Sequence, residues 1–549
     1  MKKNLFKRLL TMVLIVAMLV GALSACGRES KETVKDDPKK VDQKKDDPKK
    51  EDPQKGDTND TAGTDGWTAF DKKVTLRIGT YDRGAEGVDP VTDNGYTRYV
   101  QEQFGDKYNV ELVFVPITRS DVMTDYALLA AVDDLPNILM EYDYPKVSQW
   151  ANDGYLQTID LEAFAQVAPT YYQRMVDLNQ LNYTKINGED YFILAERPYY
   201  NTTYTFINMV RMDWLEQVGY DHVPANYDEY CDAMQKIIDA GIAEHPQGGK
   251  MITEAYVPNF GFRDYPVNDE DWAMHSSLGT ASLSWGPTKK LIKRANAEYH
   301  KGFINPEYFT IDVETEKANF INGKTYKYGG YMTASVDWLN SFYAANPDAK
   351  LAVDTIYSSV EPGVIDFPQI RSDNPYGMTI GFGKDSTSDE LKAAWMYMEW
   401  CTLNIKELQS HPTDWNNFNN SKDFWCVTIE SVKADTIEAS IGAISPKELP
   451  KDFTQEMIDN YHDLKEVADA GHAYTDPAYA VAINAEAEYN AALFSLYVEY
   501  YDNLVMCEPA EFDKLYDELS KAYLDAGYKE IIDERLAAYK AGSSTKLPR

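Results

Sequence analysis

Strand-like and helix-like segments alternate along residues 74–152, and this order constrains the fold more than any other feature of the chain. Residues 74–80 (VTLRIGT) alternate apolar and polar side chains, which predicts a strand. The pattern continues with a helix, a strand (YNVELVFV), a helix, a short buried strand and a last helix, expected at about 92–104, 108–115, 120–132, 138–140 and up to 152. Such an alternation predicts a parallel sheet with helices on its faces.

The loops that follow two of these strands mark a candidate binding site. In open parallel sheets, ligands bind at the carboxyl ends of the strands. The loops at 81–86 and 141–144 stand in those positions, so we expect both to face one ligand.

The N-terminus has the layout of an export signal. Lysine or arginine at positions 2, 3, 7 and 8 precedes an apolar stretch over 9–22 that is too short for a membrane span. The following LSACG at 23–27 resembles the lipobox of bacterial lipoproteins, in which the signal is cleaved before the cysteine and the cysteine is lipidated. We expect residues 1–25 to be a lipoprotein signal peptide and Cys26 to anchor the protein to the outer face of the cell membrane. Two acyl chains on this cysteine would bind the bilayer stably, whereas a single chain would dissociate and rebind. A signal without lipidation is the alternative.

A tether follows the anchor. Residues 27–73 have almost no apolar content and contain KDDPKK twice, at 35–40 and 45–50. Such a segment cannot bury enough surface to offset its ordering entropy, so we expect residues 26–73, lipidated cysteine included, to be a disordered charged tether. As a flexible coil it would span roughly 35–40 Å. Its nearly balanced charge favours a solvated spacer over a nucleic-acid-binding segment.

The rest of the chain is strongly acidic. The chain has 54 Lys and Arg against 88 Asp and Glu; the first 73 residues hold 16 and 13 of these, which leaves 38 against 75, a net charge of −37. A field of that sign repels nucleic acid and favours a soluble monomer, so we expect no nucleic-acid partner. It also makes a polyanionic ligand less favoured, unless a local basic cleft overrides it.

No metal or cofactor is expected. The cysteines at 231, 401, 426 and 507 are widely spaced, which predicts neither a zinc site nor a disulfide framework; one disulfide remains open, without a choice of pair. Asp89, Asp93 and Asn94 could supply oxygens to calcium, but the EF-hand spacing is absent and capping of the loop is favoured.

Four blocks of sequence, in order, resemble the sugar-binding family of extracellular solute-binding proteins of ABC importers, which includes maltose-binding protein. The blocks are DLPNI with DGYLQTID (134–138, 153–160), FIN with RMDWL and VPANYDE (206–208, 211–215, 223–229), FINGK with ASVDWL (320–324, 334–339), and a strand followed by a long helix (377–400). The resemblance covers about 74–405. Asn137 replaces the family's usual aspartate, and Asn226-Tyr227 replaces Thr-Trp, which indicates distant membership. The anchor and length fit the oligosaccharide-associated lipoprotein branch of Gram-positive bacteria.

The resemblance implies an α/β, two-lobed periplasmic-binding-protein-like fold with a hinge and a ligand cleft between the lobes. Residues 74–200 and 375–425 would form the N-terminal lobe, and 201–374 and 426–549 the C-terminal lobe. Chain crossings are expected near 197–205 and 371–376. Ligand binding would close the lobes and make no bond, so the resemblance implies a receptor that delivers a carbohydrate to a permease, and not an enzyme.

A sugar site needs polar groups for the hydroxyls and aromatic rings for the C–H faces. The family's block order points to Asp82 and Arg83 after the first strand, and to Tyr142 and Asp143 after the third. Trp338, beside Asp337, matches the family's cleft tryptophan, and its replacement by alanine is expected to weaken binding without unfolding the protein. The tryptophans in irregular stretches complete the candidates: Trp272, Trp285 and Trp425. Trp338 and Asp143 also have structural interpretations, as a core ring and as a helix cap.

Two other functions remain open, a surface-anchored glycan-active hydrolase and a peptide-binding receptor. The sequence has no G-x-S-x-G, H-E-x-x-H, P-loop or dinucleotide-binding motif. An S-x-x-K match at 543–546 lies in the polar tail without its partner motifs. Among 75 acidic residues a glycosidase pair can always be proposed, but spacing alone supports none.

Overall fold

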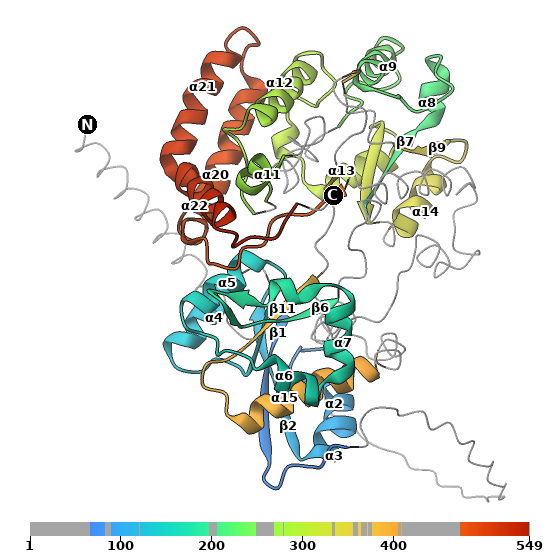
Figure 1. Ribbon diagram of the computed structural model, residues 1–549. Coiled ribbons are helices and arrows are strands. Elements are labelled where there is room, and N and C mark those ends of the chain that lie inside the picture. Colours follow the sequence, from blue (N-terminus) through green and yellow to red (C-terminus); the bar gives the residue numbers. More distant parts are fainter. Residues whose placement is uncertain are drawn as a thin grey trace, which may run out of the picture. The chain divides into compact units, whose positions relative to one another are not determined.

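A computed structural model describes residues 66–82, 89–119, 121–196, 206–248, 268–277, 279–331, 335–354, 361–363, 370–371, 376–404, 408 and 473–547 (Figure 1). All of them belong to one compact unit, residues 61–549. The predicted signal peptide, most of the tether, Cys26, Arg83, Trp425 and Cys426 lie outside these ranges, as do most residues of the two predicted crossings.

The first sheet has five strands in the order β2-β1-β3-β11-β6. Strand β1 (Val74–Asp82) pairs in parallel with β2 (Val110–Thr118) and with β3 (Ile138–Glu141), which confirms the predicted parallel sheet. Strand β11 (Tyr376–Phe382) runs antiparallel to β3 and to β6 (Ile193–Glu196). The last block of family-like sequence, which contains β11, therefore belongs to the same sheet as β3, which begins at the end of the first block.

Helices cover this sheet close to where the sequence predicts them. They are α2 (Gly95–Val100), which continues through η1 (Gln101–Gly105) into α3 (Asp106–Tyr108), then α4 (Val122–Ala131), α5 (Tyr144–Asn152), α6 (Leu161–Val167), α7 (Pro169–Asp177) and α15 (Ser388–Leu403). Turn η2 (Gln180–Tyr183) and a hairpin, β4 (Lys185–Ile186) with β5 (Glu189–Asp190), follow α7. Asn94 caps α2 in a capping box, as favoured over a calcium role.

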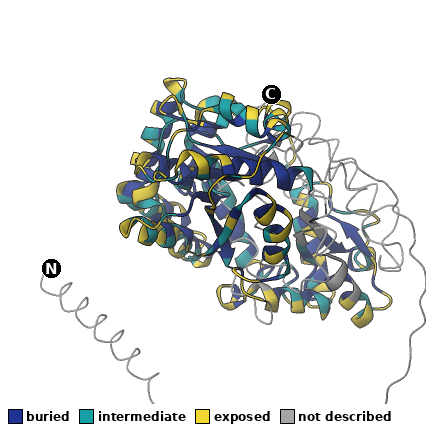
Figure 2. Ribbon diagram, turned by 90° about the horizontal axis from the view of Figure 1, so that it is seen from below, coloured by how far each residue is buried: buried dark blue, intermediate teal, exposed yellow. Residues whose placement is uncertain are grey.

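The hydrophobic core of the first sheet lies between its strands and the helices that cover them. Leu76 and Ile78 of β1 are fully buried, and α15 is buried along Ala393–Thr402, so this helix lies inside the region. Gly79 leaves room for Tyr126 of α4, because a Cβ at this position would lie 2.3 Å from the tyrosine hydroxyl oxygen and the buried ring would have to shift. Figure 2 shows the buried residues along the strands and the exposed ones on the outer helices.

The second sheet has β7 (Phe206–Arg211) between β8 (Lys327–Tyr331) and β9 (Leu351–Val353), both antiparallel to β7. Neighbouring residues of β7 point to opposite faces: Met209 packs with α13 (Val313–Ile321) and α14 (Ser335–Ala345), and Val210 with α8 (Met212–Gln217) and α9 (Tyr227–Asp239). Both faces of this sheet are therefore covered.

The C-terminal helices pack on a part of the chain that precedes them by about two hundred residues. The helices are α20 (Asn484–Met506), α21 (Phe512–Tyr523), η9 (Leu524–Tyr528) and α22 (Lys529–Lys540), which pack with α11 (Asp269–His275), α12 (Gly286–His300) and turn η4 (Tyr308–Thr310) (Figure 1). Two short strands, β10 (Ile370–Arg371) and β12 (Ala473–Tyr474), pair in parallel. The sequence blocks did not anticipate this cluster of helices.

Two findings concern the described ranges only. None of their helices is long and apolar enough to cross a membrane, and no group of three or more His, Cys, Asp or Glu could hold a metal. The three cysteines within these ranges, Cys231, Cys401 and Cys507, are free thiols.

Candidate functional site

Charged and aromatic side chains gather where β1, β2 and β3 end. Tyr81 and Asp82 close β1, Arg119 directly follows β2, and Glu141 closes β3. Because Asp82 pairs with Thr118 in the parallel register, the ends of β1 and β2 lie at the same edge of the sheet. We call Tyr81, Arg119, Glu141, Tyr142 and Asp143 the strand-end cluster.

Glu141 is the buried centre of the strand-end cluster, with 1% of its surface exposed. The Tyr81 hydroxyl donates to its Oε2 at 2.8 Å. The backbone N–H groups of Tyr142 and Asp143 donate to its Oε1 at 2.8 and 3.1 Å. A buried carboxylate is stable only when its oxygens accept hydrogen bonds, and three uncharged donors supply them here.

Arg119 lies beside two tyrosine rings. Its guanidinium carbon is 4.8 Å from the ring centroid of Tyr81 and 5.6 Å from that of Tyr142, within the range of cation–π attraction. Its Nη1 is 3.8 Å from Glu141 Oε2, and the side chain is 33% exposed. The arginine is thus held in place while part of it stays accessible. Burial, followed by the nearby Glu141, raises the pKa of Tyr81 well above its ordinary value, so its hydroxyl remains a donor.

Asp143 stands at the N-cap position of α5, but its side chain makes no capping hydrogen bond. Its Oδ2 lies 3.5 Å from Lys146 Nζ, and the side chain is 35% exposed. Burial raises the pKa of Asp143 to about 6; Lys146 opposes this rise, and the charges of Glu141 and Glu486 add to it. Asp143 is therefore a carboxyl group that can change its charge near neutral pH.

Three of the residues that the sequence proposed for the site lie at this sheet edge, and three further residues there were not proposed. Asp82, Tyr142 and Asp143 lie at one sheet edge, as the strand-end rule predicts. Tyr81, Arg119 and Glu141 were not chosen as site residues. Tyr81 and Glu141 lie inside the two loops that the rule selected, and Arg119 follows the second predicted strand, so the same rule could have found all three.

The three candidate tryptophans within the described ranges, Trp338, Trp272 and Trp285, pack in other hydrophobic clusters. Trp338 on α14 is 5% exposed and packs edge-on against Phe320 and Tyr328, with ring centroids 5.7 and 5.2 Å away. The side chain of its neighbour Asp337 is outside the described part of the protein. Trp272 is fully buried in α11, so its assignment to an irregular stretch is wrong; its Nε1 donates to the Thr475 carbonyl at 2.6 Å.

Trp285 precedes α12 at its N-cap position, and its ring stacks on that of His275 at 5.0 Å. His275 Nδ1 is 2.8 Å from the Tyr528 hydroxyl, and burial lowers the pKa of His275 to about 4. This histidine is therefore neutral at physiological pH, and the pair forms a packed contact between α11 and α12.

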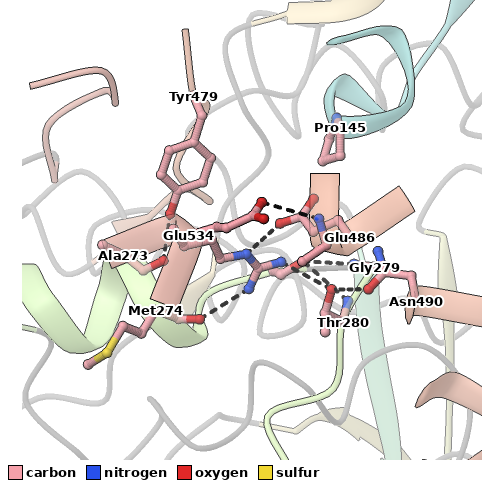
Figure 3. A network of polar contacts seen from close by, with 12 residues as sticks. Pro145, Ala273, Met274, Gly279, Thr280, Tyr479, Glu486, Asn490 and Glu534 are labelled. Carbon is pink, nitrogen blue, oxygen red and sulfur yellow. Dashed lines mark hydrogen bonds and ion pairs between the residues drawn. The ribbon is translucent and has the colours of Figure 1, made fainter. Parts of the chain in front are cut away.

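A second polar cluster, in which Figure 3 labels Met274, Thr280 and Glu486, surrounds Arg535 on α22. Its Nε donates to Glu486 Oε1 at 2.5 Å, Nη1 to the Met274 carbonyl at 3.1 Å and Nη2 to Thr280 Oγ1 at 3.0 Å. The side chains of Arg535 and Glu486 are 2% and 5% exposed. We call Arg535, Glu486, Thr280 and the Met274 carbonyl the buried arginine cluster.

Helix α5, which begins directly after Asp143, contacts the segment that carries Glu486. Asn152 Nδ2 donates to Asn484 Oδ1 at 3.3 Å, and the Asn187 N–H donates to the Ala480 carbonyl at 2.7 Å. Ala478 packs in the core of the first sheet. The 473–487 segment thus contacts the region of the first sheet. The residues that follow this segment in the sequence form the C-terminal helices.

Two α/β regions with separate sheets, between which the chain passes more than once, define a two-lobed solute-binding fold. The family of bacterial extracellular solute-binding proteins matches residues 89–404, more than half of the chain, and this protein belongs to that family. This confirms the family resemblance of the sequence blocks.

Solved structures with the same fold come from distant relatives. An extracellular solute-binding protein from Bifidobacterium longum subsp. infantis is 14% identical, with 87% of this chain and 100% of that chain covered and a TM-score of 0.57. An alginate-binding protein solved without calcium ion is 14% identical, with 86% and 99% covered and a TM-score of 0.58. An HMO-binding, ABC-transporter-associated solute-binding protein from Bifidobacterium longum infantis is 12% identical, with 86% and 100% covered and a TM-score of 0.57. A comparison with curated proteins found no match.

Proposed function

We propose that this protein is a lipid-anchored receptor that captures an oligosaccharide outside the cell and delivers it to the permease of an ABC transporter. Its family binds solutes outside the cytoplasm and works with ABC transporters. The observation that carries the carbohydrate assignment is the strand-end cluster, where tyrosine rings, an arginine and an accessible carboxylate meet at the ligand-binding edge of a sheet.

The chemistry of the strand-end cluster suits a sugar. The ring of Tyr142 is half-buried and can cover a C–H face, while Asp143 can accept hydrogen bonds from hydroxyl groups. Arg119 can donate to ring or hydroxyl oxygens from a position that Tyr81 and Tyr142 hold. The name of the HMO-binding neighbour supports the same ligand class for this chain.

We further propose that the ligand lies between two lobes of the protein. We assign 74–200 with 375–425 to the N-terminal lobe and 201–374 with 426–549 to the C-terminal lobe. The ligand would lie between Asp82, Arg83 and the strand-end cluster on one side and Asp337 on the other. The buried rings of Trp338, Trp272 and Trp285 are left out of this proposed site, and Trp425 stays a candidate from the sequence alone.

A binding panel tests this function. The full-length protein in detergent is heated with oligosaccharides and with peptides, and the solution is assayed for released sugars. A bound sugar at one hundred times its Kd should add about 2.7 kcal/mol to the free energy of unfolding and raise the Tm without products. Tyr142→Ala should reduce this rise, while Tyr172→Ala, at a half-buried position of α7, serves as the matched control. Released sugars would instead identify a hydrolase, and a rise with peptides alone a peptide receptor.

Anchoring is tested separately. Replacement of Cys26 by serine should release the protein from membranes and impair sugar uptake, because a flexible tether supplies a local concentration on the order of mM at the permease. Sugar affinity in solution should not change. A variant that stays in the membrane fraction would contradict lipidation at Cys26.

A further inference from the structure

Glu141 contacts every other member of the strand-end cluster, yet it is out of reach of a ligand because only 1% of its surface is exposed. Its Oε2 accepts from the Tyr81 hydroxyl and lies 3.8 Å from Arg119 Nη1. Its Oε1 accepts from the backbone N–H groups of Tyr142 and Asp143. One buried carboxylate thus joins the ends of β1, β2 and β3 to the start of α5.

The hydrogen bonds of Glu141 fix the turn that presents Tyr142 and Asp143. The two N–H groups that bind its Oε1 are the first two after β3, where the chain leaves the sheet and α5 begins. Buried backbone N–H groups need acceptors, and a single oxygen that accepts from two consecutive groups restricts the backbone between them. The directions in which the Tyr142 ring and the Asp143 carboxylate leave the chain therefore depend on Glu141.

The charge of Glu141 acts on Arg119 in a different way. At 3.8 Å their contact is longer than a hydrogen bond, so the carboxylate attracts the guanidinium without occupying its N–H groups. The guanidinium lies beside the rings of Tyr81 and Tyr142 at the same time. Arg119 is thus held by charge and by aromatic rings, and its planar set of donors stays available for ligand oxygens.

A second buried glutamate in the region of the first sheet shows what a structural carboxylate does. Glu399 of α15 is fully buried, and its two oxygens accept from the backbone N–H groups of Thr170 and Tyr171 at 3.0 and 2.9 Å. These N–H groups belong to the first turn of α7, where a negative charge stabilises a helix. Glu399 therefore serves a helix end, whereas Glu141 serves side chains that can contact a ligand.

We infer that Glu141 is a positioning residue of the sugar site. Its charge holds Arg119 beside the two tyrosine rings, and its hydrogen bonds set the turn at Tyr142 and Asp143. It acts on the ligand only through these neighbours. The inference rests on the proposed carbohydrate function and adds to that function a residue that determines how tightly the sugar is bound.

Glu141→Gln separates the charge of this residue from its hydrogen bonds. The glutamine oxygen can accept from the same two N–H groups, and its amide N–H can donate to the Tyr81 hydroxyl oxygen. That hydroxyl lies 3.1 Å from the Met140 carbonyl, so it can donate there instead. The free energy of unfolding in urea should therefore change little. Calorimetry of the full-length protein with hexasaccharides of glucose, galactose and mannose should show about fivefold weaker binding of any probe that binds, the upper limit for a partly exposed ion pair.

A double-variant cycle and a matched control separate positioning from a structural role. The loss of affinity caused by Arg119→Ala should be about fivefold smaller when Glu141 is already glutamine, because the arginine is then no longer held in place. Glu399→Gln is the control. Its amide N–H would face one of the two N–H groups of α7, so this variant should lose stability and keep its sugar affinity.

The possible outcomes each decide the inference. Unchanged or tighter sugar binding by the Glu141→Gln variant would overturn it and leave the proposed function standing, and so would equal losses from Arg119→Ala in both backgrounds. A loss of stability as large as that of Glu399→Gln would also overturn it, because Glu141 would then be a structural residue. If the unchanged protein binds none of the probes, the carbohydrate function fails, and the inference fails with it.

Discussion

The strand-end cluster and the buried arginine cluster each contain a buried carboxylate, but they satisfy it differently. Glu141 accepts hydrogen bonds from a tyrosine hydroxyl and two backbone N–H groups, and its arginine remains 33% exposed. Glu486 depends on Arg535, whose guanidinium is buried and also binds Thr280 and the Met274 carbonyl. In the first cluster the arginine is not needed to satisfy the carboxylate; in the second it is.

This difference distinguishes a candidate ligand-binding site from an ion pair that stabilises the fold. A buried charge that loses its partner destabilises a protein strongly, whereas a charge that uncharged donors already satisfy tolerates the loss of a distant cation. Changes in the buried arginine cluster should therefore act on stability, and changes in the strand-end cluster on ligand binding.

The largest effect is expected for Arg535→Ala. The variant leaves Glu486 buried without its cation, so the free energy of unfolding should fall by about 3–5 kcal/mol in urea titrations. A double variant, Arg535→Met with Glu486→Gln, removes both charges and should recover a large part of this loss. A loss below about 1 kcal/mol in the single variant would show that the pair does not brace the C-terminal helices.

Trp338→Ala should have the next largest effect. The ring packs against Phe320 and Tyr328 with 5% of its surface exposed, so its truncation should cost about 3 kcal/mol of stability. This differs from the expectation, made from the sequence, that the variant would bind less without unfolding. Trp338→Phe keeps much of the packing and is the control. A stable alanine variant that loses sugar affinity would restore the ligand-binding interpretation.

Arg119→Ala should change stability by less than about 1 kcal/mol, because Glu141 keeps its three uncharged donors. Sugar affinity should fall by roughly 10- to 150-fold, since a charge-assisted hydrogen bond contributes about 1.5–3 kcal/mol. Arg98→Ala is the matched control. Arg98 lies on α2, its side chain is 62% exposed, and it pairs with Asp93. Both measurements are made by calorimetry. Unchanged affinity would remove Arg119 from the site.

Much of the first sheet could be predicted, because local patterns determine it. The alternation in 74–80 and the cap at Asn94 act within a few residues, and the structure follows them. The burial of Trp338 could not be predicted, because it depends on Phe320 and Tyr328, which reach it only through the fold. The Arg535–Glu486 pair joins positions 49 residues apart on two helices, and no local spacing announces it.

The role of Arg119 was hidden for a different reason. Its position after a strand was visible in the sequence, but an arginine there can equally be a solvated surface residue. Only the three-dimensional arrangement shows that Tyr81 and Tyr142 both lie within 6 Å of its guanidinium carbon. Side-chain function at a sheet edge thus depends on which neighbours the register brings together, and a single strand cannot reveal it.

The smallest effect is expected for Asp143→Asn, as a change in the pH dependence of stability. Because folding raises the pKa of Asp143 to about 6, the protonated form is favoured in the folded protein. Its contribution to stability is fully present below the unfolded pKa of about 3.9 and is lost as the pH rises through about 6. With 35% of the side chain exposed, solvent screening should keep this contribution below about 1 kcal/mol.

The measurement compares the ligand-free protein and the variant at pH 5 and pH 7.5. The unchanged protein should lose slightly more stability over this interval than the asparagine variant, which has no proton to release at this position. Asp517→Asn on α21, where Asp517 pairs with Lys289 at 3.1 Å, controls for the removal of one negative charge on the surface. Parallel pH profiles for all three proteins would mean that Asp143 is solvated like an ordinary surface carboxylate. The strand-end cluster would then lose the partly buried charge that distinguishes it from the rest of the acidic surface.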